Sequence, residues 1–243
     1  MEAAEAIRRA LGATGRLTVL TGAGVSAESG VATFRTAGGL WEKHRIEDVA
    51  TPTAFARNPR LVLDFYNARR RQLFEVKPNP AHFALARLEE HLGDRFTLIT
   101  QNVDDLHERA GSRRVYHMHG ELLMARCVDC AEALRWERDI TLEDACTRCG
   151  GRMRPHIVWF EEIPFYLDDV IPRALDADVF AAIGTSGSVY PAAGMVLEVR
   201  QRGGLTVEVN LEPSENTQWF EHRVLGPAGS TLPGLVSEIV DRA

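Results

Sequence analysis

The chain has 243 residues, 45% of them hydrophobic and 26% charged, with a net charge of −6 at pH 7. This length supports one large hydrophobic core, alone or with a small satellite domain. No apolar run approaches the roughly eighteen residues of a membrane helix, and the N-terminal segment lacks the apolar stretch of a signal peptide. The acidic balance disfavours binding to phosphate backbones. We therefore expect a cytoplasmic protein that binds neither membranes nor nucleic acid.

The chain opens with a charged segment of helical pattern, MEAAEAIRRAL, and then alternates short apolar runs with helical segments. The expected strands are Leu17–Leu20, Phe96–Ile99, Val115–His117, Val179–Ile183 and Leu205–Val209. The expected helices are Leu61–Phe74, Pro80–His91, Ala192–Gln201 and Leu235–Arg242. This alternation predicts an α/β fold, in which helices cover both faces of a Rossmann-like parallel sheet.

Two segments interrupt the alternation and are expected to form a small second domain. Residues 36–77 contain a helical stretch, and residues 121–155 contain every cysteine of the chain. The predicted small domain therefore combines a helical insertion with a zinc ribbon. The predicted Rossmann-like domain is discontinuous, and it consists of residues 1–35, 78–120 and 156–243.

Small or polar residues follow each of the five expected strands. In open α/β sheets, ligands bind beyond the carboxyl ends of the strands, so five such endings predict a single crevice. The crevice residues are Gly22, Ala23, Gly24, Gln101, Asn102, Asp104, His119, Gly184, Thr185, Ser186, Asn210, Leu211 and Glu212.

The first of these endings, Gly22–Ala27, matches the G-x-G-x-x-G/A pattern of a dinucleotide-binding turn. An ordinary turn onto a helix gives the same pattern. In a dehydrogenase of the Rossmann type, an acidic residue stands on the second strand about twenty positions further on. Glu47 and Asp48 have roughly that spacing, but they lie in a stretch of loop and helix character. The insertion thus interrupts the half-unit that hydride transfer would need.

The four cysteines form two pairs, Cys127-x2-Cys130 and, fifteen residues later, Cys146-x2-Cys149. Two such pairs are typical of a tetrahedral zinc site, which we favour over free thiols or a redox pair. Four thiolates leave no open coordination position. We therefore expect one structural zinc ion.

Several further motifs occur together and in order. They are GAGVSAESGVATFR, TQNVDDLHERAG, HMHG, GTSGSVYPAAG and VNLEPS, with the two cysteine pairs between the third and fourth. On these motifs the chain resembles the sirtuins, NAD-dependent protein lysine deacylases, from about Arg16 to the C-terminus. The resemblance implies that the acyl-lysine carbonyl oxygen attacks the ribose carbon that carries nicotinamide. NAD is then consumed, and the acyl group leaves as O-acyl-ADP-ribose.

Such chemistry needs a base for a ribose hydroxyl. The resemblance assigns that role to His119, which precedes a glycine at a strand end, and His117 is its rival. The remaining motif-free histidines are expected to be structural; they are His44, His82, His91, His107 and His222. The NAD-binding residues that the resemblance implies are Gly22, Ala23, Gly24, Ser26, Phe34, Arg35, Gln101, Asn102, Asp104, Gly184, Thr185, Ser186, Asn210, Leu211, Glu212 and Ala228.

Tyr66 and Arg69 are spaced i, i+3 on the expected helix Leu61–Phe74, so they are neighbours on one helix face. A phenol beside a guanidinium suits a carboxylate. The chain resembles the sirtuin class whose Tyr-x-x-Arg pair selects succinyl- and malonyl-lysine, and Ala50 matches the small residue of that class. The alternative is a solvated helix face that carries three consecutive arginines.

The substrate peptide is expected to add as a strand along the segment RPHIVWFEE, where the resemblance assigns substrate binding to Val158 and Phe160. The family usually has Phe-Gly-Glu here, and Glu161 replaces that glycine. The expected partners are acylated lysine side chains of proteins or peptides, and we expect a monomer.

Deacetylation is expected as a second activity. Two other functions stay open: a mainly deacetylating enzyme, and mono-ADP-ribosyl transfer, which would use the same crevice. A zinc-ribbon binding module without enzymatic activity is disfavoured by the acidic balance and by the crevice motifs.

Overall fold

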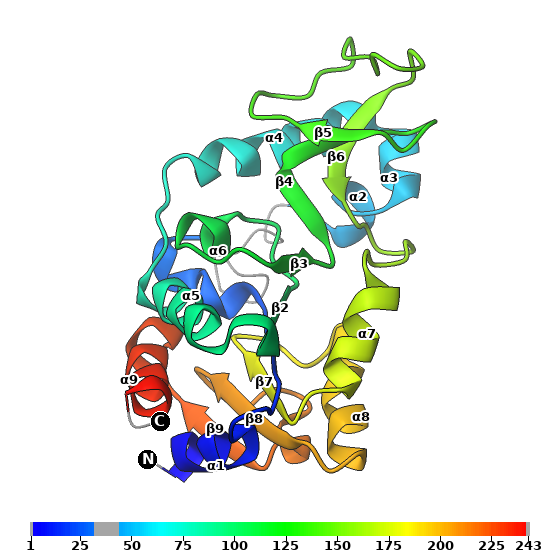
Figure 1. Ribbon diagram of the computed structural model, residues 1–243. Helices are drawn as coiled ribbons and strands as arrows, with labels where there is room; N and C mark the ends of the chain where they lie inside the picture. The colour runs from blue at the N-terminus through cyan, green and yellow to red at the C-terminus, as the bar shows by residue number, and fades with distance from the viewer. Residues whose placement is uncertain (1, 32–43, 242–243) are drawn as a thin grey trace.

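The computed structural model describes residues 2–31 and 44–241, and its largest unit is a six-stranded parallel sheet (Figure 1). The strands lie in the order β3-β2-β1-β7-β8-β9. Their bounds are β1 Leu17–Thr21, β2 Phe96–Thr100, β3 Val115–His117, β7 Val179–Ile183, β8 Leu205–Asn210 and β9 His222–Leu225. The chain runs outward from β1 to β3 and then outward from β7 to β9, so the strand order reverses between β1 and β7. The predicted α/β fold with a Rossmann-like sheet is confirmed.

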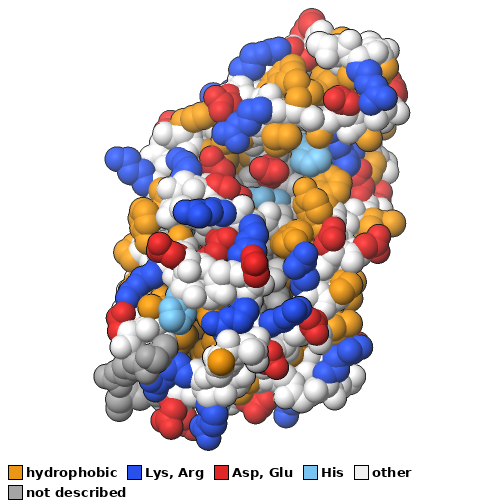
Figure 2. All heavy atoms as spheres, in the orientation of Figure 1, with side chains coloured by type: hydrophobic (Ala, Val, Ile, Leu, Met, Phe, Trp, Pro, Cys, Tyr) orange, Lys and Arg blue, Asp and Glu red, His pale blue; other side chains and the backbone are white. Residues whose placement is uncertain are grey.

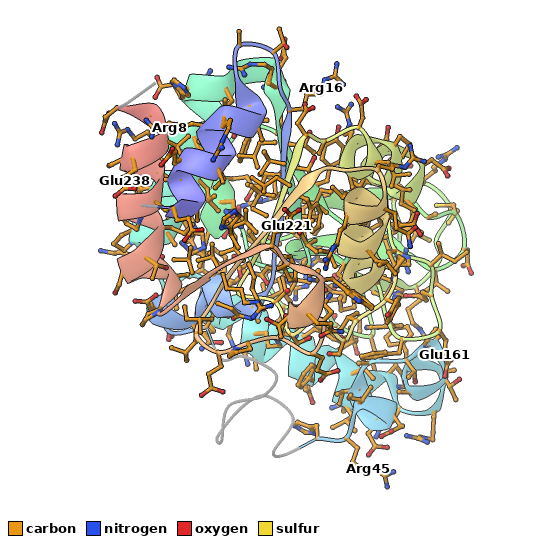
Figure 3. All side chains as sticks on the ribbon, turned by 90° about the horizontal axis from the view of Figure 1, so that it is seen from below. Arg8, Arg16, Arg45, Glu161, Glu221 and Glu238 are labelled. Atoms are coloured by element: carbon orange, nitrogen blue, oxygen red, sulfur yellow. The ribbon has the colours of Figure 1, made fainter. Side chains whose placement is uncertain are left out.

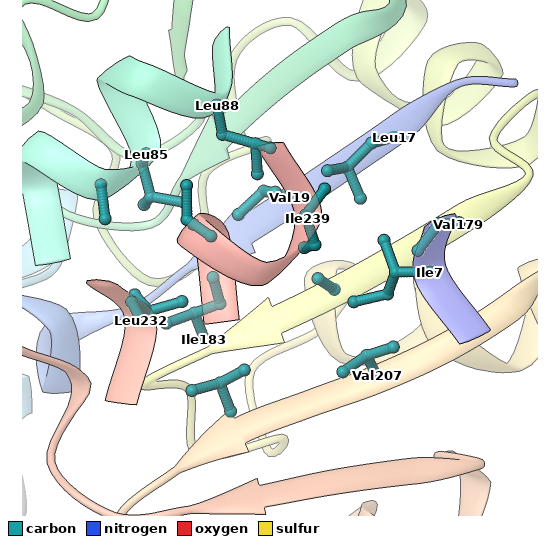
Figure 4. Close-up of a cluster of buried hydrophobic side chains, with 14 of the residues drawn as sticks. Ile7, Leu17, Val19, Leu85, Leu88, Val179, Ile183, Val207, Leu232 and Ile239 are labelled. Carbon is teal, nitrogen blue, oxygen red and sulfur yellow. The ribbon is translucent and has the colours of Figure 1, made fainter. Parts of the chain in front are cut away.

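Helices cover both faces of this sheet, because successive strand residues point in opposite directions. Val19 belongs to the buried cluster under α1, α5 and α9, whereas Leu20 belongs to the cluster under α7 and α8. Figure 4 shows Leu85, Leu88 and Ile239 of the first cluster above the strands. The bounds of these helices are α1 Glu2–Leu11, α5 Pro80–Leu92, α7 Leu167–Leu175, α8 Met195–Gln201 and α9 Ala228–Val240.

A second, antiparallel sheet lies at the opposite end of the molecule from α1 and α9 (Figure 1). Its strand order is β5-β4-β6, and three helices pack with it around a separate hydrophobic cluster. The bounds are β4 Gly120–Cys127, β5 Ala133–Arg135, β6 Met153–Ile157, α2 Ile46–Val49, α3 Pro52–Arg57 and α4 Pro59–Leu73. The small sheet thus brings the cysteine segment together with the helical segment, although the predicted domain boundaries stay a prediction.

Local capping explains where α3 and α4 begin. The Thr51 hydroxyl and the Asn58 side-chain oxygen each accept a hydrogen bond from a backbone N–H three residues further on. Each is followed by a proline at the first helical position, where the missing N–H costs nothing. The Thr51 cap fixes the start of α3, and the Asn58 cap fixes the start of α4, the helix that carries Tyr66 and Arg69.

The structure adds elements to those predicted. Strand β9 and the whole antiparallel sheet were not among the expected strands, and α9 begins at Ala228 rather than at Leu235. The expected helix over 192–201 is a short 3₁₀ turn followed by α8. The remaining short elements are α6 Leu106–Arg109, η1 Ala23–Val25, η2 Ala27–Ser29, η3 Gly93–Arg95, η4 Ala192–Gly194 and η5 Thr217–Trp219. Within residues 2–31 and 44–241, every helix is too short or too polar to cross a bilayer.

Candidate active site

The glycine turns after β1 and β7 pack backbone against backbone at the point where the strand order reverses. The N–H of Gly24 donates to the carbonyl oxygen of Gly184 over 2.9 Å, and the N–H of Gly22 donates to the carbonyl oxygen of Ile183 over 3.0 Å. A Cβ atom on Gly24 would lie 2.7 Å from the Gly184 Cα. Gly184 itself has a φ of +61°, which side-chain-bearing residues rarely adopt. The glycines therefore let the two turns meet at the predicted ligand crevice.

Behind these turns, three of the predicted site residues form one hydrogen-bonded group. The hydroxyl of Ser26 donates to the Asp104 carboxylate over 3.0 Å, and the Asn102 amide donates to the Ser26 oxygen over 3.1 Å. All three side chains are buried. Burial raises the pKa of Asp104, although hydrogen bonds from the Leu106 amide and Ser26 oppose the shift. The group joins the segment after β1 to the segment after β2.

His119 lies just beyond the end of β3, beside Gln101. Its Nδ1 atom is 3.1 Å from the Gln101 carbonyl oxygen. Because a carbonyl can only accept, Nδ1 carries the proton, and Nε2 of the neutral ring keeps its lone pair. Burial lowers the pKa of His119, partly offset by the Gln101 hydrogen bond. The ring is therefore held in the tautomer and charge state that a general base requires.

His117 has different surroundings. Its Nδ1 atom contacts the Asn102 carbonyl at 3.1 Å, and its Nε2 atom contacts a Glu108 carboxylate oxygen at 2.7 Å. Burial alone would lower the pKa of His117, but the hydrogen bond and charge of Glu108 outweigh it and raise that pKa. Both ring nitrogens face acceptors, which favours the protonated ring, and both are occupied by these contacts. Of the two rivals, only His119 has the geometry of a base.

The predicted adenosine side of the crevice lies across β7, β8 and the start of α9. The Asn210 amide, at the end of β8, donates to the Thr185 carbonyl oxygen over 2.7 Å. Ser186 shares a 2.7 Å hydrogen bond with Ser188, and Leu211 and Glu212 are exposed just beyond β8. Ala228 is the first residue of α9. The next N–H, that of Gly229, donates to the Glu28 carboxylate over 2.6 Å, which connects α9 to the glycine turn.

The predicted substrate segment is positioned by main-chain hydrogen bonds on both sides. The N–H of Val158 donates to the His119 carbonyl oxygen over 2.9 Å, and the N–H of Phe160 donates to the Ala50 carbonyl oxygen over 3.0 Å. Between them, the buried Trp159 ring has its centroid 6.3 Å from that of Tyr66. A continuous set of contacts therefore leads from His119 through Trp159 to the helix that carries the predicted acyl clamp.

Tyr66 and Arg69 lie together at the end of this path. The guanidinium carbon of Arg69 is 5.9 Å from the centre of the Tyr66 ring. Burial raises the pKa of Tyr66 to about 12, against the opposing charge of Arg69, so the phenol stays protonated and can donate. Burial also lowers the pKa of Arg69, and the charges of Tyr66 and Asp104 oppose that shift. Arg69 thus lies within electrostatic reach of Asp104.

The four cysteines meet at one point in the small sheet region. Their sulfur atoms all lie within 4.8 Å of one another, with 3.5 Å between Cys127 and Cys149 and 3.6 Å between Cys130 and Cys146. A tetrahedral ion with sulfur ligands at about 2.3 Å requires sulfur–sulfur distances of about 3.8 Å. The cluster fits a zinc ion, which these four thiolates would hold and which would pin the two cysteine loops together.

Two predicted site residues, Phe34 and Arg35, lie outside the residues that the structure describes.

Trp159 is a residue of the site that the sequence analysis did not select. It lies between the predicted residues Val158 and Phe160, and no motif distinguished it from them. Its ring lies 3.4 Å under the Arg154 guanidinium, which donates to both carboxylate oxygens of Glu162. Phe55 also packs against Trp159 and was not predicted; the centroids of the two rings are 5.2 Å apart.

Side chains of both charges cover the face shown in Figure 2. Basic and acidic side chains are interspersed there, with apolar side chains among them. A single-sign basic stripe, typical of nucleic-acid binding, is not seen on this face.

Comparison with known proteins agrees with this geometry. A curated relative from Salmonella typhimurium (strain LT2), named NAD-dependent protein deacylase, is 56% identical over 229 residues, which are 93% of this chain and 84% of the relative. A relative of the same name from Escherichia coli (strain K12) is 55% identical over 229 residues, 93% of this chain and 82% of its own length.

Solved structures give the same result. A Sir2 homologue in complex with NAD superposes with a TM-score of 0.90 at 42% identity, covering 98% of this chain and 94% of the other. A Sir2 protein bound to a myristoylated histone peptide superposes with a TM-score of 0.74 at 33% identity, covering 98% of this chain and 97% of the other. The family model described as the Sir2 family matches residues 22–191. The predicted resemblance to sirtuins is therefore confirmed, and the chain belongs to the Sir2 family.

Proposed function

We propose that this protein is an NAD-dependent protein lysine deacylase that favours acidic acyl groups, succinyl and malonyl, and also removes acetyl groups. Its products are free lysine, nicotinamide and an O-acyl-ADP-ribose. The relatives named NAD-dependent protein deacylase support the reaction class, and the NAD and peptide complexes of Sir2 homologues support the two substrates. The contact path from His119 through Trp159 to Tyr66 and Arg69 carries the acyl preference.

The NAD molecule is held by the groups beyond the strand ends. The close-packed turns at Gly24 and Gly184 allow its phosphates to approach the backbone, together with Gly22, Ala23 and Ser26. Amide and carboxylate groups of Gln101, Asn102 and Asp104 match the hydrogen-bonding groups of the nicotinamide and its ribose. On the other side, the adenosine half is held by Gly184, Thr185, Ser186, Asn210, Leu211, Glu212 and Ala228.

His119 acts on the proton of a ribose hydroxyl. With Nδ1 donating to the Gln101 carbonyl, the Nε2 lone pair is the acceptor, and its burial keeps the ring neutral at physiological pH. The peptide pairs with the main chain around Val158 and Phe160, which lie between His119 and Ala50. That placement directs the acylated side chain toward the buried rings of Trp159 and Tyr66.

The far end of the acyl group meets the clamp. The Tyr66 hydroxyl, protonated because burial raises its pKa to about 12, donates one hydrogen bond to a terminal carboxylate, and Arg69 donates charge-assisted ones. A partly desolvated guanidinium gains more from an anion than a solvated one does. Acetyl-lysine lacks the carboxylate and therefore gains nothing from Arg69.

The test compares matched succinyl-, malonyl- and acetyl-lysine peptides, with and without NAD, by following lysine and nicotinamide release. Arg69→Met should lower kcat/KM for the succinyl peptide by about 10- to 100-fold, the value of a hydrogen bond to a charged group, and leave the acetyl value nearly unchanged. Arg60→Met is the matched control, because Arg60 is exposed near the start of the same helix. Equal losses on both peptides contradict the clamp. Lysine release without NAD, or transfer of NAD-derived label onto protein instead of deacylation, contradicts the reaction itself.

A further inference from the structure

Helix α4 presents two different sets of polar side chains from one turn. Tyr66 and Arg69 belong to the acyl clamp, whereas Asn67 and Arg70, interleaved with them in sequence, are bound to β4 and to the loop that precedes Cys146. Asn67 is 4% exposed and Arg70 is fully buried. Polar groups this deeply buried are costly unless each is well paired, so their partners identify what they hold in place.

Asn67 is joined to a single backbone position of the cysteine segment. Its amide nitrogen donates to the Ile140 carbonyl oxygen over 2.9 Å, and its side-chain oxygen accepts from the Ile140 N–H over 2.9 Å. The Asn67 side chain thus binds both the N–H and the carbonyl oxygen of Ile140, as the backbone of a neighbouring strand would. Ile140 is itself 1% exposed and lies between the two cysteine pairs.

Arg70 extends the same connection to β4. Its Nε atom donates to the Leu122 carbonyl oxygen over 2.7 Å, and its Nη1 atom donates to the Asn67 side-chain oxygen over 2.6 Å. Burial lowers the pKa of Arg70 to about 10, opposed by Asp139, so it stays charged at neutral pH. Within the described residues its Nη2 atom has no partner. A buried cation held mainly by neutral oxygens is weak evidence for a contribution to stability.

We propose that Asn67 is a positioning residue for acyl selection: by fixing α4 to Ile140 in the cysteine segment, it sets where Tyr66 and Arg69 meet the acyl carboxylate. The inference rests on the proposed function of this site. His119, Asp104 and the glycine turns lie on other elements, so a shift of α4 should change acyl recognition more than it changes their arrangement. A misplacement of about 1 Å in a positioning contact can cost about 100-fold in rate.

The experiment measures kcat and KM for succinyl- and acetyl-lysine peptides of one sequence, in the wild type and in Asn67→Ala. The expected result is a rise of about tenfold in the succinyl KM, with acetyl parameters changed by less than about twofold. Asn67→Asp keeps the acceptor for the Ile140 N–H and should recover part of the succinyl KM. Asp64→Ala, an exposed change on the same helix, is the control. A parallel loss on both peptides, with the succinyl-to-acetyl ratio preserved, overturns the proposal.

A second measurement does not depend on turnover and serves if Asn67→Ala folds poorly. It measures the equilibrium zinc affinity of the cysteine cluster by competition with a chromophoric chelator, in the wild type and in Asn67→Asp. Because coupling between sites is reciprocal, the succinyl peptide should raise the zinc affinity more than the acetyl peptide does in the wild type, and the difference should shrink in Asn67→Asp. Equal zinc affinities with both peptides in the wild type overturn the proposal. Arg69→Met separates the two failures: if it abolishes the succinyl preference while Asn67→Ala preserves it, only the positioning role is wrong.

Discussion

The Nδ1 atom of His119 faces the carbonyl oxygen of Gln101 at 3.1 Å, and this contact fixes which ring nitrogen can accept a proton. Burial lowers the pKa of His119 below its ordinary value of 6.5, although the Gln101 hydrogen bond opposes the shift. The base must be neutral to act. We therefore expect kcat/KM to be constant through neutral pH and to fall only on the acid side, with a midpoint below 6.5.

The matching variant is His119→Ala, which should lose about 10²- to 10⁴-fold in kcat, the usual contribution of a general base. His91→Ala is the control, since His91 is exposed on α5. Nicotinamide release across a pH series measures both effects. An acid limb centred above pH 6.5, or a His119→Ala variant as active as the wild type, would show that another group supplies the base.

His117 and Glu108 should make stability depend on pH in the opposite sense. The folded state raises the pKa of His117, so the pair contributes stability that is complete below the unfolded value of 6.5 and is lost as the pH rises through the folded pKa. Glu108→Gln removes the charge that holds His117 protonated. Urea unfolding should therefore show a larger difference between wild type and Glu108→Gln near pH 6 than near pH 9. A difference that is constant, or that grows with pH, contradicts this assignment.

Five of the six strands of the parallel sheet could be predicted because they are short, largely apolar runs rich in β-branched or aromatic residues. Val179–Ile183 is buried at every position, and a short run of apolar residues like this one is typical of a strand in a parallel sheet that is covered on both faces. Strand β9, His222–Leu225, alternates partly buried with exposed residues and is only four residues long, so its pairing with β8 decides its structure. Strand β6 contains Arg154, Pro155 and His156, and its strand conformation depends on β4.

For the site, the sequence favoured His119 over His117 through the glycine that follows it and through the resemblance, but it did not indicate the contacts that distinguish the two rings. That distinction depends on Glu108, which binds His117 and leaves His119 without a carboxylate partner among the described residues. Likewise, the hydrogen bond from the Gly229 N–H to the Glu28 carboxylate joins residues far apart in the chain, and no local sequence pattern predicts it. The first residues of α9 include Gly229 and Pro233, poor helix formers whose helical state is imposed by packing on the sheet.

Gly184→Ala tests the close approach of the two glycine turns. A Cβ atom at Gly184 would lie 2.5 Å from the Val25 amide nitrogen, so the turns must separate where the phosphates are expected to bind. We expect a higher KM for NAD and a loss of about 1–3 kcal/mol in the free energy of unfolding. Gly203→Ala is a matched control, because Gly203 also has a positive φ but its Cβ would meet nothing within 4 Å. If both variants raise the KM for NAD alike, backbone strain rather than contact between the turns is responsible.

Glu161→Gly should make the protein more stable. Glu161 has a φ of +77°, the left-handed region that glycine occupies without steric cost, which explains why the family usually has glycine at this position. Figure 3 shows its side chain at the outer edge of the molecule, and Glu161 is exposed, so little packing is lost when it is removed. Relief of the strain, reduced by the greater freedom of glycine in the unfolded chain, should raise the free energy of unfolding by about 0.5–1 kcal/mol.

Urea midpoints measure this change, with Glu143→Gly as the control. Glu143 is also exposed but is not among the residues with a positive φ, so the same substitution there should lower stability. Because Val158 and Phe160 keep their main-chain hydrogen bonds to His119 and Ala50 on one side of position 161, the gain should come without a change in NAD consumption. A Glu161→Gly variant less stable than the wild type would mean that the glutamate side chain contributes contacts that outweigh its backbone strain.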